Sequence, residues 1–224
     1  MKAIIRNIVF ACPEESLRAL AAFYGELLGM RVIREDWLVI TRDGSSLPRI
    51  AFGDGAADSY EPPRWPHTDF PQQAHLDITV HDLEAAEESV RRLGATQLQD
   101  RGDYRSFADP VGHPFCLYRD VARGRGEAGS GLSGRLARIV FDCPAPKELA
   151  TFYGELLGMP ETELDSPDRV VIAGEIGDSP MLAFQRAPTY KAPRWPDPAF
   201  PQHLHLDLQV EDAAHPFCLC APDQ

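Results

Sequence analysis

The sequence predicts an α+β fold built from tandem βαβββ modules, and three observations support this prediction. The octapeptide FYGELLGM occurs twice, at Phe23–Met30 and at Phe152–Met159, which marks two copies of one unit. Shorter words recur in the same order: FACP returns as FDCP, while PRWP, FPQ and HPFCL return unchanged. Within each copy, segments with the period of a strand alternate with segments of helical period.

The first module begins with a β-branched strand at Ile4–Ala11. A helix follows, because leucines and a tyrosine recur at three- and four-residue steps, and Gly29 stands where a helix should stop. Short strands are predicted at Trp37–Thr41 and Arg49–Phe52, separated by turn residues. The proline-rich segment Tyr60–Gln73 then predicts an ordered loop across the surface.

The same order of elements begins again after this loop. Polar and apolar residues alternate from His75 to Val80, as in a strand with one apolar face. Asp82 is placed to cap a second helix, and Gly94 to end it. Three further strands are predicted: Thr96–Gln99, Tyr104–Ala108 and Pro114–Arg119. Residues 1–120 are therefore expected to form one domain of two modules.

A glycine-rich linker at residues 121–134 leads into a second domain at residues 135–224. This copy repeats the strand, the helix, the next strands and the loop, but then it becomes shorter. The offset between the copies is 130 residues at Trp65 and Trp195 but 102 residues at His113 and His215, so 28 residues have no counterpart. They correspond to the second helix and two strands.

This shortfall has a physical consequence, because parallel neighbouring strands need a crossover of a dozen or more residues and only two alanines are present here. Either the last module is truncated and rebuilt as a hairpin, or residues of the protein are missing from the sequence near 212–215. The second explanation is favoured.

Composition narrows the classes of partner. The formal charge is −12 and the pI is near 5.0, whereas nucleic acids and anionic membranes select a basic face, so neither is expected as a partner. Met1-Lys2 leads directly into strand-like sequence without the apolar core of a signal peptide, which predicts a cytoplasmic protein. Four of the five cysteines occupy matching places in the repeats, which indicates fixed strand positions instead of a disulfide framework.

Several motifs together resemble the vicinal-oxygen-chelate superfamily, which includes glyoxalase I, extradiol dioxygenases and bleomycin-resistance proteins. They are a strand followed by a helix ending in FYxxLLGM, a later strand that opens with His, and the DPxGxxxxL segment Asp109–Leu117. The PRWP and GHPFCL words are most similar to glyoxalase-like domains. The resemblance covers nearly the whole chain except the linker, and it identifies two tandem copies.

The resemblance implies cupped mixed sheets with the helices on the outer face and a polar interior that holds a divalent metal. The metal ligands of the superfamily come one each from several strands and are typically His, Gln or Glu. These positions fall on Asn7 and Arg138 in the first strand, His75 and His205 in the fifth, Cys116 and Cys218 in the last, and Ala51 and Ala183 at a further position without a donor.

Strand parity supports a shared site, because His75 and Cys116 both alternate with apolar residues and therefore face the same cup. One His and one Cys are fewer than the three protein ligands that zinc or iron requires, and Arg138 would repel a cation. We therefore expect no cofactor, and keep as the alternative a divalent metal with His75 as a ligand in the first copy and His205 in the second.

Other interpretations of these residues remain open. Cys116 is either a small buried residue of the strand or a nucleophile with His75 as its base. Asp77 and Asp207 are expected to bond loop amides in preference to acid–base chemistry. Trp65 and Trp195 are either lids that stack on a flat ligand or side chains that pin the loop to the core.

The function that we expect from these features is metal-independent binding or sequestration of a small organic molecule, as in the drug-binding members of the superfamily. The alternative is a divalent-metal-dependent lyase, isomerase or dioxygenase. A homodimer is compatible with either. The candidate ligand-binding residues are Asn7, Trp65, His75, Asp77, Cys116, Tyr118, Arg138, Trp195, His205, Asp207 and Cys218.

Overall fold

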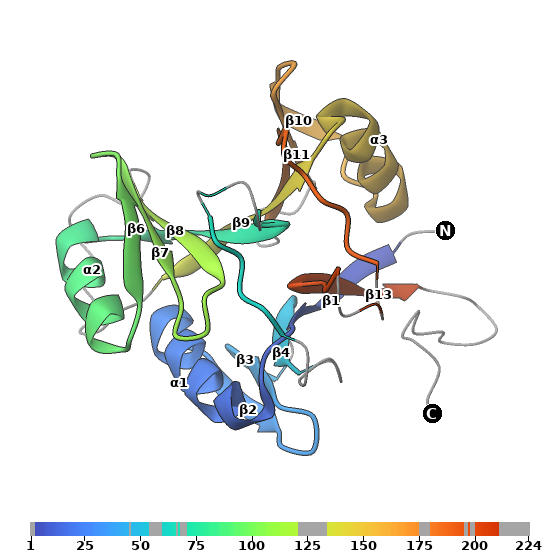
Figure 1. Cartoon of the computed structure of the whole chain (residues 1–224). Helices are drawn as coiled ribbons and strands as arrows, with labels where there is room; N and C mark the ends of the chain where they lie inside the picture. The colour runs from blue at the N-terminus through green and yellow to red at the C-terminus, as the bar shows by residue number, and fades with distance from the viewer. Residues whose placement is uncertain are drawn as a thin grey trace.

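The computed structural model describes residues 3–44, 46–53, 60–65, 67, 71–120, 134–174, 180–194, 197 and 200–210. Its elements form three complete βαβββ modules and one further strand (Figure 1). The α+β class predicted from the sequence is therefore confirmed. Most of the predicted linker and the segment near 212–215 lie outside the described residues.

The modules follow one another along the chain. The first contains β1 (Ala3–Phe10), a short 3-10 turn (Glu14–Ser16), α1 (Leu17–Leu28), β2 (Arg31–Arg34), β3 (Val39–Thr41) and β4 (Arg49–Phe52). The second contains β5 (Ala74–Val80), α2 (Leu83–Arg92), β6 (Thr96–Asp100), β7 (Tyr104–Ala108) and β8 (Pro114–Arg119). The third contains β9 (Arg135–Cys143), α3 (Pro146–Leu157), β10 (Glu161–Asp165), β11 (Arg169–Ala173) and β12 (Met181–Arg186), and β13 (Leu204–Val210) follows.

The predicted helix signals act as expected. Gly29 takes the left-handed conformation after α1, with φ of 64°, and its repeat Gly158 does the same after α3, with φ of 62°. The side chain of Asp82 accepts a hydrogen bond from the Ala85 amide at 2.9 Å and so caps α2. β2 was not specifically predicted, because all four of its residues are exposed and the strand buries neither face.

Two mixed sheets join the modules across the two copies. One sheet has eight strands in the order β10-β11-β12-β9-β5-β8-β7-β6, and the other has five in the order β13-β1-β4-β3-β2. Antiparallel seams between β5 and β9 and between β1 and β13 connect the copies. The two copies therefore pair with each other within one chain.

Strand pairing also confirms the module geometry. The first and last strands of each complete module are parallel neighbours, β1 with β4, β5 with β8 and β9 with β12. Such neighbours need a long crossover, which the helix and the two intervening strands supply. No helix in the described part of the chain is long and apolar enough to cross a membrane.

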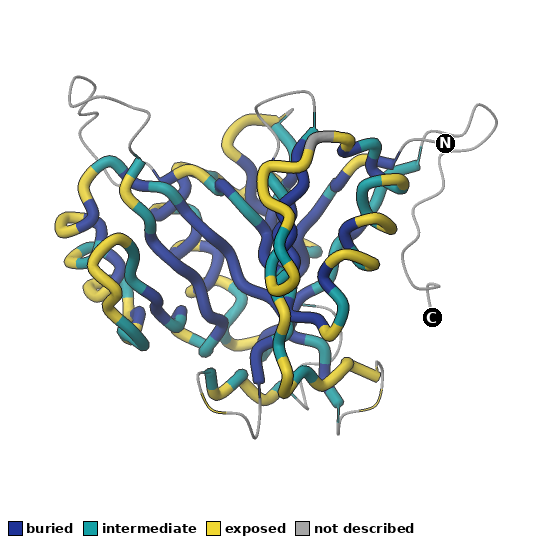
Figure 2. The backbone as a smooth tube through the Cα atoms, turned by 90° about the horizontal axis from the view of Figure 1, so that it is seen from above, coloured by how far each residue is buried: buried dark blue, intermediate teal, exposed yellow. Residues whose placement is uncertain are grey.

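The main core lies between the sheets and the helices. Leu76, Ile78 and Val80 point from β5 into this core, together with the apolar faces of all three helices. Figure 2 shows that burial concentrates in the strands, while each helix alternates between buried and exposed residues along its length. We call the opposite face of each sheet the cup face. In the eight-stranded sheet, the cup face carries the polar residues of β5.

A buried polar cluster joins the first two modules behind the cup. Tyr24 of α1 donates a hydrogen bond to Asp109 Oδ2 at 3.0 Å, and His113 Nδ1 lies 2.9 Å from the same oxygen. The amides of Val111 and His113 donate to Asp109 Oδ1. The DPVGHPF segment therefore folds as a turn around its own aspartate, and its role here is structural.

Candidate functional site

The candidate site lies on the cup face of the eight-stranded sheet, where β5 passes between β8 and β9. His75 and Asp77 are two residues apart on β5 and so point to the same side. The β5–β8 register places Cys116 directly beside Asp77, and the β5–β9 register places Arg138 on its other side. The site therefore depends on strands from both copies.

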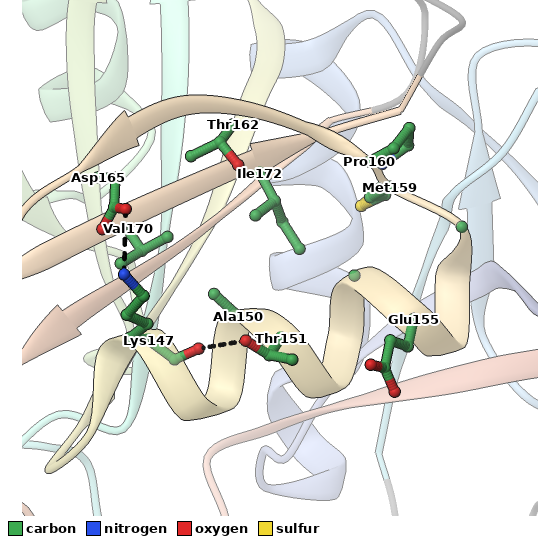
Figure 3. A pocket seen from close by; sticks show the side chains of 12 residues that line it. Lys147, Ala150, Thr151, Glu155, Met159, Pro160, Thr162, Asp165, Val170 and Ile172 are labelled. Atoms are coloured by element: carbon green, nitrogen blue, oxygen red, sulfur yellow. Dashed lines mark hydrogen bonds and ion pairs between the residues drawn. The ribbon is translucent and has the colours of Figure 1, made fainter.

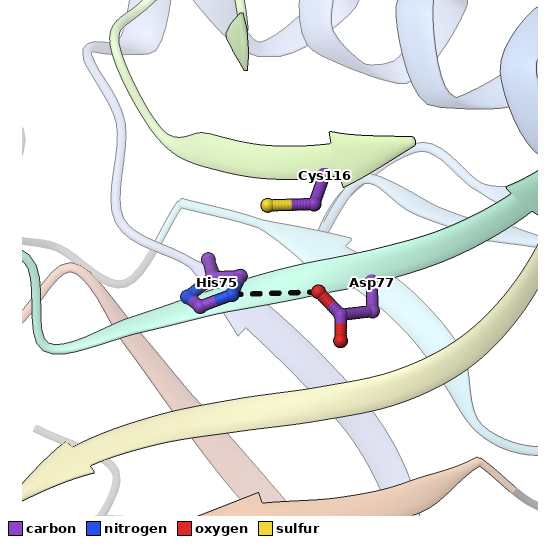
Figure 4. A group of neighbouring side chains, drawn as sticks. All are labelled: His75, Asp77 and Cys116. Carbon is purple, nitrogen blue, oxygen red and sulfur yellow. Dashed lines mark ion pairs between the residues drawn. The ribbon is translucent and has the colours of Figure 1, made fainter. Parts of the chain in front are cut away.

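His75, Asp77 and Cys116 form a compact buried group (Figure 4). One ligand atom from each of the three lies within 4.8 Å of the others. His75 Nε2 is 3.4 Å from Asp77 Oδ1, and Cys116 Sγ is 3.2 Å from the Ser106 hydroxyl. Asp77 is fully buried, and His75 and Cys116 each retain 7% exposure.

Two arginines compensate the charge of Asp77. Arg138 Nε donates to Asp77 Oδ2 at 2.8 Å, and Arg169 Nη2 approaches the same oxygen at 3.5 Å. Burial raises the pKa of Asp77, but the hydrogen bond from His75 and the charges of His75 and Arg138 outweigh it and hold the pKa below its usual value. Asp77 is therefore ionised at neutral pH.

His75 is also charged. Burial lowers the pKa of its imidazole, whereas hydrogen bonds with Asp77 and Cys116 raise it, and the result is a pKa of about 10. Three cationic side chains thus surround Asp77, since Arg138 and Arg169 lie on its other side.

A second carboxylate lies farther along β9. Gln185 Nε2 donates to Asp142 Oδ1 at 2.7 Å, and Gln72 Nε2 donates to the same oxygen at 3.3 Å. Arg169 Nη1 in turn donates to Gln185 Oε1 at 3.1 Å, so the hydrogen bonds run from Asp77 to Asp142. Burial raises the pKa of Asp142.

Apolar and aromatic side chains complete the cup face. Val140, Val171 and Ala183 form a buried cluster against which Met181 packs. Tyr118 stacks on Tyr104 at a centroid distance of 5.0 Å, and the Arg138 guanidinium lies 5.2 Å from the Tyr118 ring centroid. A ligand in this cup would meet cationic groups beside an aromatic wall.

The five-stranded sheet repeats part of the arrangement at its own seam. His205 Nε2 lies 3.4 Å from Asp207 Oδ1, the same separation as between His75 and Asp77. Asn7 Nδ2 donates to Asp207 Oδ2 at 2.8 Å and so replaces the arginine of the first seam. The two predicted metal ligands, His75 and His205, belong to different sheets.

The structure brings together five of the predicted site residues in the first cup: His75, Asp77, Cys116, Tyr118 and Arg138. Asn7, His205 and Asp207 form the second cluster. Trp65 is half-buried in the proline-rich loop. Trp195 and Cys218 lie outside the described residues.

Sequence reasoning missed Ser106, Asp142, Arg169 and Gln185. Strand parity could have found two of them, because Ser106 alternates with the buried Phe107 and Gln185 lies two residues beyond Ala183. Arg169 opens β11, and no local pattern indicates that it reaches Asp77 on β5.

Two grooves lie on the helix side of the sheets, away from this group. One has a volume of about 690 Å³ between α3 and strands β10 and β11, where Lys147 Nζ lies 3.3 Å from Asp165 Oδ2 (Figure 3). The other, of about 470 Å³, occupies the matching place between α1 and β2. Their lining contains none of the predicted site residues, so we interpret the grooves as features of the repeated module.

Comparison with solved structures supports the fold. A glyoxalase I mutant from Zea mays superposes with a TM-score of 0.56 at 15% identity, covering 83% of this chain and 70% of that chain. A protein of Bacillus subtilis that carries a provisional dioxygenase assignment gives a TM-score of 0.51 at 17% identity. That match covers 84% of this chain but 64% of the Bacillus chain.

A FosX fosfomycin resistance protein from Listeria monocytogenes matches 54% of this chain and 94% of its own, with 17% identity and a TM-score of 0.41. No curated protein sequence matches the chain. The family model for the glyoxalase-like domain matches residues 7–118 and 138–218, which include both repeats and both seams. The chain therefore belongs to the glyoxalase-like domain family of the vicinal-oxygen-chelate superfamily.

Proposed function

We propose that the cup of the eight-stranded sheet binds a small organic anion without a resident metal. The observation that carries this proposal is the charge of the cup. The cationic side chains of His75, Arg138 and Arg169 outnumber the carboxylates of Asp77 and Asp142 that they face. A carboxylate, phosphate or phosphonate group on a ligand would pair with the two arginines.

The arginines are placed to act as the anion-binding groups. The side chains of Arg138 and Arg169 keep 26% and 30% exposure, whereas Asp77 is fully buried beneath them. An incoming anion can therefore reach guanidinium donors without displacing Asp77. Arginine suits this role because its planar group presents several donors to an oxyanion at once.

The remaining surface of the cup suits the organic part of such a ligand. The Tyr118 ring and Met181, which packs against the buried cluster of Val140, Val171 and Ala183, supply apolar surface. Small-molecule sites commonly combine such apolar walls with a few convergent polar groups.

A thermal-shift screen tests the proposal. Planar antibiotics, aldehyde–thiol adducts and small carboxylates and phosphonates are compared with neutral analogues, because a ligand at 100 times its Kd stabilises the folded state by about 2.7 kcal/mol. Arg169→Gln is expected to abolish the shift given by the anions. The matched control Arg186→Gln should keep it, because Arg186 bonds Pro144 and Pro167 carbonyls on the helix side of its strand. Equal shifts from anions and neutral analogues would contradict the proposal.

A divalent-metal-dependent lyase, isomerase or dioxygenase is the second candidate, and one observation favours it. His75 Nδ1 is buried and has no hydrogen-bond partner among the described residues, while the buried Asp77 Oδ1 faces His75 Nε2 at the long distance of 3.4 Å. The 3.4 Å between His75 Nε2 and Asp77 Oδ1 also equals the separation of two ligands about 2.1 Å from a tetrahedral ion.

His75, Asp77 and Cys116 would then hold the ion, which would polarise a substrate oxygen as a Lewis acid. The spacing fits a metal, but the charge does not, because Arg138 already donates to the same carboxylate. Metal analysis of protein purified without chelator separates the candidates. One equivalent of metal that is lost in His75→Ala would establish the second candidate and overturn the first.

A further inference from the structure

The strands β2 and β10 occupy the same place in the two repeats, and each lies at the edge of a sheet. β2 ends the five-stranded sheet and pairs with β3 alone among the described strands, while β10 ends the eight-stranded sheet and pairs there with β11 alone. The outer edge of each strand therefore presents backbone N–H and C=O groups that another strand can bond.

The two edges carry opposite charges. The octapeptide before each strand is identical in the two copies, but β2 reads RVIR, with two arginines and no acid, whereas β10 reads ETELD, with three acids and no base. Charges on an edge strand commonly keep edges from pairing. Charges with that single purpose would have the same sign on both edges, so that two copies repel each other. Opposite signs make the edges of two copies attract instead.

Neighbouring ion pairs leave one charge on each edge without a partner in the described part of the chain. On β2, Arg34 pairs with Asp36 at 2.7 Å, but Arg31 has no such ion pair. On β10, Asp165 pairs with a lysine of α3 at 3.3 Å, but Glu163 has no such ion pair. Both of these remaining side chains are exposed, so a contact between the two edges would pair them with each other.

Both edges also expose large apolar side chains. Val32 and Ile33 of β2 are 42% and 41% exposed, and Leu164 of β10 is 44% exposed. Each edge borders one of the two grooves on the helix side, because Val32 lines the smaller groove and Thr162 lines the larger one. An approaching strand would therefore meet apolar surface as well as an opposite charge.

We propose that the β2 edge of one copy of the chain pairs with the β10 edge of a second copy. The two edges of a single chain cannot meet, because they belong to different sheets and lie well apart in Figure 1. The complementary edge is therefore supplied by another copy. The contact involves none of the residues to which the proposed function assigns ligand binding, so it goes beyond that function.

The geometry of the edges predicts the kind of assembly. Each copy contributes one edge of each kind, so the contact is heterologous and copies add head to tail. A bulge lies between Val32 and Arg34 in β2, and another lies between Thr162 and Leu164 in β10, so the paired segment is short. A small interface is typical of a weak, transient association. We therefore expect an assembly that depends on protein concentration.

Sedimentation velocity of the full chain tests the proposal. The weight-average sedimentation coefficient should rise between about 10 μM and about 0.5 mM protein, the range in which weak complexes form. The rise should be smaller in about 0.5 M salt than in about 0.05 M salt, because salt screens exposed charges. A coefficient that does not rise with protein concentration, or a rise that grows with salt, would overturn the proposal.

Charge reversal identifies the two edges. Arg31→Glu and Glu163→Lys should each abolish the rise, because each replaces the opposite charge on one edge by a like charge. Glu163→Lys also makes the acidic chain less negative, so repulsion between whole chains cannot explain a loss of association in this variant. The control Glu88→Lys makes the same charge change at an exposed position of α2, in the module that contributes neither edge, and should keep the rise.

A mixture of the two variants separates this contact from pairing between like edges. In an equimolar mixture of Arg31→Glu and Glu163→Lys, the substituted β2 edge of one variant meets the substituted β10 edge of the other, so opposite charges face each other again and the rise should return. Both positions are exposed, so the Tm of each variant should equal that of the wild type. No recovery in the mixture, or a loss of association in only one of the two variants, would overturn the pairing of β2 with β10.

Discussion

The Tyr24 hydroxyl allows the strongest test of the packing, because the sequence contains its own control. Tyr24 and Tyr153 occupy the same position of the identical octapeptide. Tyr24 is fully buried and donates to Asp109 Oδ2 at 3.0 Å, whereas the Tyr153 hydroxyl has no hydrogen bond to any described residue and its ring stacks on Phe141 and Phe184. Replacement of either tyrosine by phenylalanine keeps the ring and removes the hydroxyl alone.

The magnitude follows from the chemistry of the bond that is lost. A hydrogen bond to a charged group contributes about 1.5–3 kcal/mol to the free energy of unfolding. Asp109 keeps the amides of Val111 and His113 and the His113 ring as partners, so the lower half of this range applies. We expect Tyr24→Phe to cost about 2 kcal/mol, and Tyr153→Phe to stay within about 0.5 kcal/mol of the wild type.

Urea unfolding followed by circular dichroism measures both variants. For a chain of this size, about 2 kcal/mol lowers the Tm by roughly 4–8 °C, so a thermal scan gives an independent reading. The slope m should be unchanged, because neither substitution alters the surface exposed on unfolding. Equal destabilisation of the two variants would show that the Asp109 contact is not what distinguishes the repeats.

Two other predictions concern stability. Burial, and then the positive charge of His113, lower the pKa of His203 to about 4, so the unfolded state binds a proton at this imidazole more tightly than the folded state does. The free energy of unfolding should therefore fall as the pH drops from about 6.5 to about 4. Urea titrations should show a smaller fall in His203→Gln than in the wild type. A Cβ at Gly134 would lie 2.7 Å from the Leu27 carbonyl oxygen and 2.9 Å from Ile78 Cγ2, so Gly134→Ala should lower the free energy of unfolding by about 1–3 kcal/mol. The control Gly44→Ala should not lower it, because a Cβ at Gly44 meets no atom within 4 Å. Equal midpoints of urea unfolding for the two variants would contradict this prediction.

The order of elements was predictable because the repeats and the hydrophobic periods are local. Gly29, Asp82 and the alternating strand at His75–Val80 each carry their signal within a few residues. The structure confirms the elements that these residues predict.

The assembly of the cup was not predictable in the same way. Strand parity placed His75 and Cys116 on one face, but no periodicity states that β5 meets β9 of the other copy. Arg169 illustrates the difficulty, because it is 92 residues from Asp77 and approaches it only through that seam. Its role depends on long-range pairing, which leaves no trace in the local sequence.

The antiparallel seams have a consequence for how the two halves can diverge. If one half paired with an identical copy of itself, every substitution at the junction would be installed twice. Fusion of the halves into one polypeptide removes this coupling, and the two junctions already differ: Asp77 faces Arg138, while Asp207 faces Asn7. Substitutions can therefore adapt one hollow to a ligand that needs cationic side chains, while the other hollow changes independently.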